Sequence, residues 1–194
     1  MHESADQHLC RSERPVQLLH RHHRSVRTVV STLRVTAGAL RGRRVPVPQR
    51  DVRPTSERAR QAFFNIVGDR IQDARFLDLF AGSGIFSLEA VSRGAESATA
   101  IDHDRSDVAL IHRVADQLSV PVTAIRGDVI ETLLRLDQQF DVVFADPPYD
   151  YENYNALLSA LDRLDLGTDS IVAIEHRRGT DPFTVTTKRL RLPD

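Results

Sequence analysis

The chain has 194 residues, of which 41% are hydrophobic and 27% charged, a composition ordinary for a soluble globular protein. No apolar stretch approaches the ~20 residues that a membrane-spanning helix needs, and residues 1–10 lack the apolar centre of a signal peptide. The single cysteine, Cys10, excludes an internal disulfide and suits a reducing compartment. We therefore expect a cytoplasmic protein with no membrane contact.

Charge is distributed unevenly along the chain. Residues 1–50 contain ten arginines against Glu3, Asp6 and Glu13, a net charge of +7, whereas the remainder has a net charge of −8. A basic segment on an acidic body indicates a polyanionic partner such as a nucleic acid. Codon usage is the alternative source of the arginine excess, because Lys188 is the only lysine.

The first part of the chain predicts a leader and a small hairpin. Residues 1–32 are polar and without sustained periodicity, so we expect a disordered leader, and their histidines lack the ligand spacing of a metal site. Between residues 33 and 48, short β-prone segments flank Gly38 and Gly42, which predicts a basic β-hairpin within an appendage of residues 33–54. The candidate phosphate-binding side chains of this region are Arg34, Arg41, Arg43, Arg44 and Arg53.

A helix and then an alternating pattern follow the hairpin. Arg53-Pro54-Thr55-Ser56 is a helix start, after which Ala59, Ala62, Phe63, Ile66 and Val67 have the spacing of one buried helix face. Strand-like runs cover 76–79, 98–101, 122–125, 141–145 and 171–174; helical runs cover 86–92, 106–118, 129–136 and 154–164. This alternation predicts an α/β fold over residues 74–194, with a doubly wound, mostly parallel sheet. Ligands of such sheets bind beyond the carboxyl ends of the strands.

The first candidate site is Asp78-Leu79-Phe80-Ala81-Gly82-Ser83-Gly84, which leads from a strand into a helix. Gly82 and Gly84 allow a tight turn and the close approach of a ligand. Ser87 stands where a dinucleotide site has its third glycine, which disfavours a pyrophosphate. Asp78 suits a ligand with an ammonium group, such as the methionine part of S-adenosylmethionine. A plain glycine-rich turn is the alternative.

Two further carboxylates follow the next two strands. Asp102 ends the second strand, where a carboxylate can accept hydrogen bonds from both ribose hydroxyls, and its neighbour Asp104 is expected to cap a helix. Asp128 follows the third strand, where a carboxylate could reach an adenine amine. Capping of the helix that starts at Val129 is an equally plain role for Asp128.

The most specific motif is Asp146-Pro147-Pro148-Tyr149, which follows a hydrophobic strand. Two prolines end the strand and fix a stiff loop at its carboxyl end. An aromatic amine is a poor nucleophile, because its lone pair is delocalised into the base. Asp146 and the carbonyl of Pro147 can accept its hydrogen bonds and favour a pyramidal nitrogen, while Tyr149 stacks on the base. Catalysis would rest on positioning rather than on a covalent intermediate.

Together these motifs resemble class I methyltransferases that methylate amines, and the upstream segments narrow the resemblance. Arg34-Val35-Thr36-Ala37-Gly38, Arg41-Gly42-Arg43, Arg53-Pro54-Thr55 and Phe64-Asn65 are similar to the bacterial 16S rRNA guanine-N2 methyltransferase family. The match runs from about residue 33 to the end, which makes residues 33–194 a methyltransferase domain.

The resemblance implies a Rossmann-like fold and transfer of a methyl group from S-adenosylmethionine to guanine N2 of 16S rRNA in the small ribosomal subunit. We expect a monomer that needs no metal. Amine activation falls on Asp146, Pro147, Pro148 and Tyr149. Arg53 and Thr55 match an element beside the cofactor pocket, although Thr55 also suits a helix cap. The candidate cofactor-binding residues are Asp78, Phe80, Gly82, Gly84, Asp102, Asp128 and Thr55.

Two features depart from the family pattern. Residues 1–32 lie outside it, and the family ends with an antiparallel hairpin of which this chain carries only the first strand, 183–192. We therefore expect the last strand to be missing and one sheet edge to be unpaired. The alternative functions are an adenine-N6 methyltransferase acting on DNA or RNA and a non-catalytic RNA-binding or assembly protein. Ser87 disfavours a nucleotide-dependent oxidoreductase.

Overall fold

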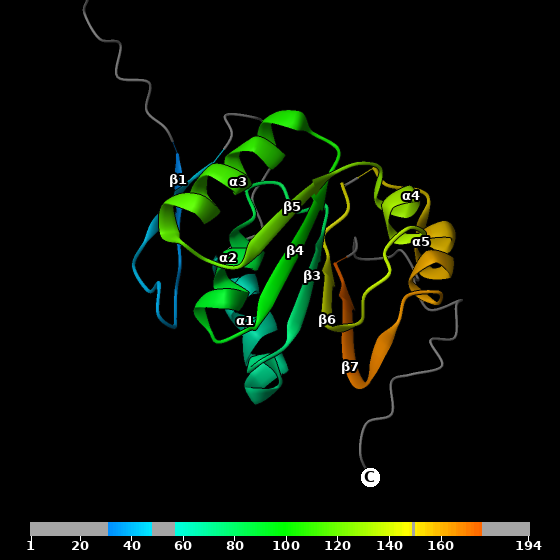
Figure 1. The fold of residues 1–194 in the computed structure, drawn as a ribbon, viewed down its shortest axis with the longest axis horizontal. Helices are drawn as coiled ribbons and strands as arrows, with labels where there is room; N and C mark the ends of the chain where they lie inside the picture. The colour runs from blue at the N-terminus through cyan, green and yellow to red at the C-terminus, as the bar shows by residue number, and fades with distance from the viewer. Residues whose placement is uncertain (1–30, 48–56, 149, 176–194) are drawn as a thin grey trace, which may run out of the picture.

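A computed structural model describes residues 31–47, 57–148 and 150–175 of the chain. Their centre is a five-stranded sheet of order β5-β4-β3-β6-β7, in which every neighbouring pair is parallel (Figure 1). The strands are β3 (Arg75–Leu79), β4 (Ser97–Asp102), β5 (Val122–Arg126), β6 (Phe140–Ala145) and β7 (Leu166–Ile174). The chain winds outward from β3 first to β5 and then to β7, so the strand order reverses between β3 and β6. The predicted doubly wound, Rossmann-like fold is confirmed.

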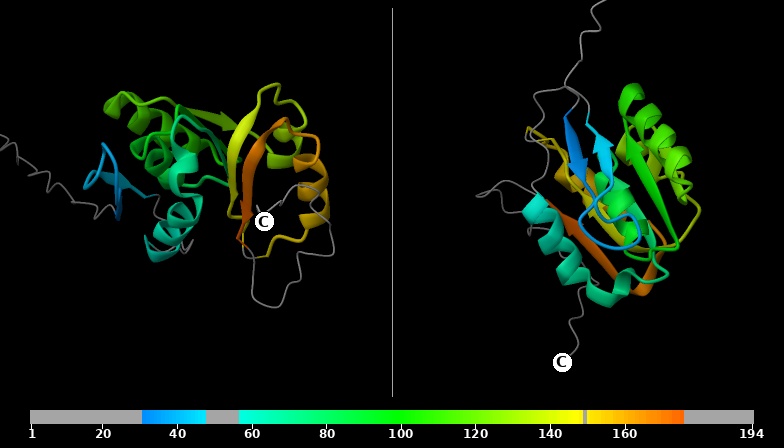
Figure 2. Two further views of the ribbon diagram at one scale, coloured as in Figure 1. Left: turned by 90° about the horizontal axis from the view of Figure 1, so that it is seen from below. Right: turned by 90° about the vertical axis from the view of Figure 1, so that its left-hand side faces the viewer.

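Helices cover both faces of the sheet (Figures 1 and 2). The helices α1 (Glu57–Val67), α2 (Ile85–Ser92) and α3 (Arg105–Leu118) lie on one face, and α4 (Val129–Leu133) and α5 (Tyr154–Leu161) on the other. Alternate residues of β3 serve the two cores: Phe76 belongs to the core under α1–α3, and Leu77 and Leu79 to the core under α4 and α5. None of the described helices is long and apolar enough to cross a membrane.

The buried face of α1 differs by one position from the predicted face. Phe63 and Val67 are buried as expected, but Ala59 and Ala62 are exposed and Ile66 is 79% exposed. Arg60 and Phe64 are buried in their place. The reason is an aromatic cluster: the Phe64 ring stacks on Phe76 at 6.1 Å, and its edge meets Phe63 at 4.9 Å between centroids. Burial of this large ring outweighs burial of the smaller Ile66. The short 3-10 helix η1 (Gly68–Ile71) then leads into β3.

The predicted hairpin is confirmed. Strands β1 (Thr32–Arg34) and β2 (Arg44–Pro46) pair antiparallel, so the first strand begins one residue before the expected start. The hairpin packs closely against the carboxyl end of α2. A Cβ on Gly38 would lie 1.6 Å from the carbonyl oxygen of Ser92, and the amide of Ala39 donates to that same oxygen at 2.7 Å. Only glycine permits this approach, because φ at residue 38 is also +75°.

A buried charged cluster holds the hairpin to the domain; we call Arg60, Glu89, Arg93 and Thr36 the hairpin anchor. The Glu89 side chain is fully buried and accepts hydrogen bonds from the Thr36 amide at 2.8 Å and from Arg93 Nε at 2.9 Å. It also accepts from the Thr36 hydroxyl. Fully buried Arg60 lies 3.5 Å from Glu89 and donates to the carbonyl of Arg34 at 2.8 Å. The negative charge is therefore compensated inside the protein.

Several sequence predictions fall on other parts of the chain. Leader residues 1–30, Arg53, Thr55, Tyr149 and the predicted strand 183–192 lie outside the described residues.

Candidate functional site

The loop after β3 folds back sharply around a buried carboxylate. Asp78 is 2% exposed, and its Oδ2 accepts hydrogen bonds from the Ser87 amide at 3.0 Å and the Ser87 hydroxyl at 2.7 Å. The loop needs positive φ angles at Phe80 (60°), Gly82 (50°) and Gly84 (71°). A bulky residue such as phenylalanine rarely adopts a positive φ angle. Such strained backbone conformations are typical of functional sites. Ser87, read from the sequence only as a missing glycine, is thus a hydrogen-bond partner of Asp78.

Asp102 links the end of β4 to this loop. Its Oδ2 accepts the Gly82 amide at 2.8 Å, and its Oδ1 accepts the Asp104 amide at 2.8 Å. Each carboxylate oxygen has a second lone pair that can accept a further hydrogen bond. A side chain at Gly82 would point into open space, so the backbone there is accessible. Asp104 caps α3 as predicted, accepting the Ser106 amide at 2.7 Å.

Asp128 takes the helix-capping role that the sequence left open. Its side chain accepts the Glu131 amide at 3.0 Å at the start of α4. Contact of Asp128 with an adenine amine stays a prediction.

Burial raises the pKa of Tyr151, and the charge of Asp128 raises it further. Because the Tyr151 ring meets the Phe80 ring edge-on at 5.1 Å, Asp128, Tyr151 and Phe80 share one region of the site. Sequence reasoning missed Tyr151, although a second aromatic residue three positions after Pro148 is a usable signal.

The Asp146-Pro147-Pro148 segment continues directly from β6. The Asp146 amide donates to the Leu79 carbonyl at 3.3 Å, which extends the β3–β6 pairing by one residue. Pro147 then ends the pairing, because it has no amide hydrogen. Pro147 is buried and Pro148 exposed, and the Pro148 carbonyl accepts the Tyr151 amide at 2.9 Å. Asp146 is therefore held at the point where the strand order reverses, between β3 and β6.

Glu175 follows β7 at the same edge, and the sequence assigned it no role. Its amide donates to the Ala145 carbonyl at 2.8 Å. Partial burial raises the pKa of Glu175, and the charge of Asp146 raises it further. Carboxylates therefore lie at the carboxyl ends of four adjacent strands in the order β4-β3-β6-β7; we call Asp102, Asp78, Asp146 and Glu175 the acidic edge.

The acidic edge has the electrostatics of a site for a cation. The pKa of Asp78 is raised to about 7, above all by burial; the hydrogen bonds from Ser87 oppose this rise, and the charges of Asp146 and Asp102 add to it. A positively charged ligand would relieve this repulsion. Within the described ranges, no group of three or more His, Cys, Asp or Glu residues could hold a metal ion.

The candidate RNA-binding arginines lie together on the hairpin. Arg34, Arg41, Arg43 and Arg44 are all exposed. Arg34 forms an exposed ion pair with Glu57 at 3.3 Å, and Arg44 donates to the Thr32 hydroxyl at 3.3 Å. These side chains are available to bind a polyanion. The hairpin that carries them is held in place by the hairpin anchor.

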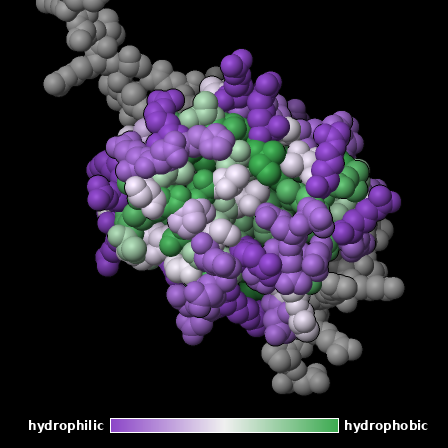
Figure 3. Space-filling view, in the orientation of Figure 1, coloured by the Kyte–Doolittle hydropathy of each residue, from purple (hydrophilic) through white to green (hydrophobic). Residues whose placement is uncertain are grey.

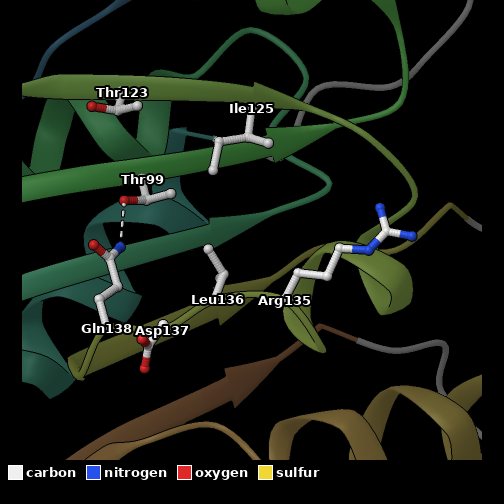
Figure 4. A pocket seen from close by; sticks show the side chains of 7 residues that line it. All are labelled: Thr99, Thr123, Ile125, Arg135, Leu136, Asp137 and Gln138. Atoms are coloured by element: carbon white, nitrogen blue, oxygen red, sulfur yellow. Dashed lines mark hydrogen bonds between the residues drawn. The ribbon is translucent and has the colours of Figure 1, made fainter.

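A pocket of about 200 Å³ is lined by none of the four residues of the acidic edge (Figure 4). It is lined by Thr99, Thr123 and Ile125 of β4 and β5 and by residues 135–138, and Gln138 Nε2 donates to the Thr99 hydroxyl at 3.1 Å. Figure 3 shows residues of higher hydropathy in a band across the middle of the face in view, with hydrophilic residues above and below the band. None of the predicted site residues lines this pocket.

Comparisons with known proteins agree with this geometry. The model of the family described as Conserved hypothetical protein 95 matches residues 33–191. Ribosomal RNA small subunit methyltransferase D of Escherichia coli (strain K12) is 38% identical over 119 residues, which is 60% of this chain and 60% of that protein. YlbH of Bacillus subtilis (strain 168), provisionally named an rRNA methyltransferase, is 32% identical over 161 residues, 79% of this chain and 88% of that protein. The solved structure of yhhF from Escherichia coli has a TM-score of 0.70 at 30% identity, covering 78% of this chain and 85% of that one.

Proposed function

We propose that this chain, which belongs to the Conserved hypothetical protein 95 family, transfers a methyl group from S-adenosylmethionine to the exocyclic N2 of a guanine in 16S rRNA. The observation that carries this proposal is the acidic edge, which joins a site for a cationic ligand to the Asp146-Pro147-Pro148 segment. The names of the relatives support an rRNA substrate. The base and the atom that accept the methyl group are part of the proposal.

The residues at the ends of β3 and β4 fit this cofactor. S-adenosylmethionine, when bound, supplies an electrophilic methyl group on a positively charged sulfur. Asp78, with its pKa raised to about 7, and the neighbouring carboxylates favour a ligand that carries sulfonium and ammonium charges. Asp102 would accept hydrogen bonds from the ribose hydroxyls, and the open backbone at Gly82 allows close approach. Phe80, Gly84, Asp128 and Thr55 complete the proposed set.

Asp146 and Pro147 would prepare the amine. The Asp146 carboxylate and the Pro147 carbonyl accept hydrogen bonds from the two amine hydrogens, which draws the nitrogen toward a pyramidal geometry and frees its lone pair. The Asp146 carboxylate can then accept the proton that the methylated nitrogen releases. Rigidity matters here, since the pairing of the Asp146 amide with Leu79 and the following prolines fix the carboxylate before the base arrives. Tyr149 would stack on the base.

The hairpin would bind the RNA backbone. Its exposed arginines present charge to phosphates, and the hairpin anchor keeps them in one orientation relative to the acidic edge. Phosphate contacts of this kind fix register and orientation, while the base is read at the site itself. Arg53 belongs to the same proposal.

One experiment tests the proposal directly. The purified chain is incubated with labelled S-adenosylmethionine and small ribosomal subunits that lack the modification, and the methylated nucleoside is then identified and mapped. We expect N2-methylguanosine at one position of 16S rRNA. N6-methyladenosine would instead favour the adenine alternative, and cofactor binding without methyl transfer would favour a non-catalytic assembly protein.

A further inference from the structure

Glu175 stands beside Asp146 at the end of the neighbouring strand. In the parallel pairing of β6 and β7, Ala145 is the partner of Ile174, so the next residues of the two strands are Asp146 and Glu175. The hydrogen bond from the Glu175 amide to the Ala145 carbonyl, 2.8 Å, continues the pairing to this point. In-register residues of parallel strands point to the same side. The charge of Asp146 contributes to the raised pKa of Glu175, which agrees with this arrangement.

The order of strands separates a donor side from an acceptor side. The proposed cofactor residues Asp102 and Asp78 lie at the carboxyl ends of β4 and β3, and Asp146 follows β6. Methyl transfer requires the sulfur, the methyl carbon and the attacking nitrogen to lie in line. The rest of the base must therefore lie on the side of Asp146 away from the cofactor. Strand β7 is the element on that side, and Glu175 is the residue that directly follows it.

The atoms next to the amine differ between the bases that carry one. In guanine, the N2 amine is flanked by N1–H, a donor, and by N3, an acceptor. In adenine, the N6 amine is next to N1, which is an acceptor, and in cytosine the N4 amine is next to N3, also an acceptor. An ionised carboxylate can only accept hydrogen bonds. Two neighbouring carboxylates therefore match the adjacent N2–H and N1–H donors of guanine, whereas one of them would face a lone pair of adenine or cytosine.

We propose that Glu175 accepts a hydrogen bond from N1–H of the guanine whose amine is held by Asp146, and so selects guanine over adenine. The inference rests on the proposed methyl transfer and deepens it by assigning the reading of the base to one side chain. Guanine also relieves the repulsion between the two carboxylates by bringing a donor to each. Adenine leaves one carboxylate without a donor, which carries the desolvation cost of an unpaired charge.

The test compares guanine with 2-aminopurine, which keeps the N2 amine but has an acceptor in place of N1–H. Small subunits are assembled with guanine, 2-aminopurine or adenine at the mapped position by ligation of a synthetic RNA segment. The ratio of kcat/KM for guanine to that for 2-aminopurine is measured for the full chain and for Glu175→Gln. Glu96→Gln is the matched control, because Glu96 is an exposed residue just before β4, at the opposite edge of the sheet. Cofactor affinity and melting temperature report on folding.

We expect the wild-type protein to prefer guanine and Glu175→Gln to lower that ratio by about tenfold to a hundredfold, the value of one charged hydrogen bond. The glutamine amide can donate to N1 of 2-aminopurine, so this substrate should lose little or gain. Glu175→Asp should keep the direction of preference, and Glu96→Gln should leave the ratio unchanged. If the guanine to 2-aminopurine ratio is unchanged in Glu175→Gln while the wild type still methylates guanine, the role of Glu175 is overturned and the proposed function stands. Methylation of adenine N6 by the wild type overturns the proposed function and this inference together.

Discussion

Two clusters of charged side chains in this molecule are built in opposite ways. In the hairpin anchor, the fully buried Glu89 lies between Arg60 and Arg93 and accepts backbone and side-chain hydrogen bonds from Thr36. In the acidic edge, carboxylates gather along four strand ends, and the pKa of Asp78 rises to about 7. A cluster whose charge is compensated internally holds the fold together, whereas a cluster with excess charge of one sign is suited to a ligand that supplies the other sign.

The largest effect on stability is expected in the hairpin anchor. Glu89→Gln removes the charge opposite Arg60 and replaces an acceptor with a donor, so we expect the free energy of unfolding to fall by about 3–5 kcal/mol. Chemical denaturation measures it. Glu131→Gln is the control, because its ion pair with Arg135, 3.4 Å long, is exposed and should contribute below about 0.5 kcal/mol. Equal stability of the two variants would mean that the anchor does not hold the hairpin.

The acidic edge should respond in activity rather than in stability. Asp146→Ala should lower methyl transfer at least about a hundredfold, equivalent to about 2.7 kcal/mol of transition-state stabilisation, because the amine loses its charged acceptor. Cofactor affinity should change little. Single-turnover assays and calorimetry separate the two quantities, with Asp116→Ala on the exposed side of α3 as the control. Near-normal turnover by Asp146→Ala would contradict the assignment.

Within the acidic edge, Asp102 should act on the cofactor. Asp102→Ala should weaken S-adenosylmethionine binding by about 2 kcal/mol, since the ribose hydroxyls lose a charged acceptor. The loss of the hydrogen bond to the Gly82 amide also loosens the loop. Calorimetry on the folded variant measures the change. Unchanged affinity would assign Asp102 to loop structure alone.

We expect Asp78 to make cofactor binding depend on pH. Its pKa of about 7 in the folded protein exceeds the usual 3.8, so the folded protein holds a proton that the unfolded chain releases between these values. The stability from this group is present below pH ~4 and is lost as the pH rises through about 7. A cationic ligand lowers the pKa, so binding near pH 6 should release up to about one proton. Calorimetry in buffers of different ionisation enthalpy measures the number of protons released on binding. If no proton is released, Asp78 does not take part in binding the cofactor.

The smallest effect per residue is expected on the hairpin surface. If Arg34, Arg41, Arg43 and Arg44 contact phosphates, RNA affinity should fall with salt, and each arginine replaced by alanine should flatten the logarithmic slope by about 0.7–0.9. Filter binding over a range of salt concentrations measures the slope. If the slope survives replacement of all four, codon usage becomes the better explanation of these arginines.

Much of the fold, and the position of the loop and the carboxylates at the carboxyl ends of the strands, could be predicted from local sequence. The alternation of strands and helices, the glycines of the loop after β3 and the strand-ending prolines are short-range signals, because they act through backbone geometry within a few residues. The hairpin between β1 and β2 followed from its glycines in the same way. Local sequence did not predict that Phe64 rather than Ile66 is buried on α1. Both residues suit a helix, and only the aromatic cluster decides which one is buried.

The amino-acid sequence by itself determined that carboxylates end the strands and that Asp146 precedes two prolines. Only the tertiary structure decided which of them stand next to each other. The order β4-β3-β6-β7 brings together residues from 78 to 175, and it gives Glu175 its place beside Asp146. Glu89 likewise reads as an ordinary helical residue until Arg60 and Thr36 surround it. The physical reason is that strand order and burial depend on long-range packing, and an electrostatic role exists only once distant charges share one low-dielectric region.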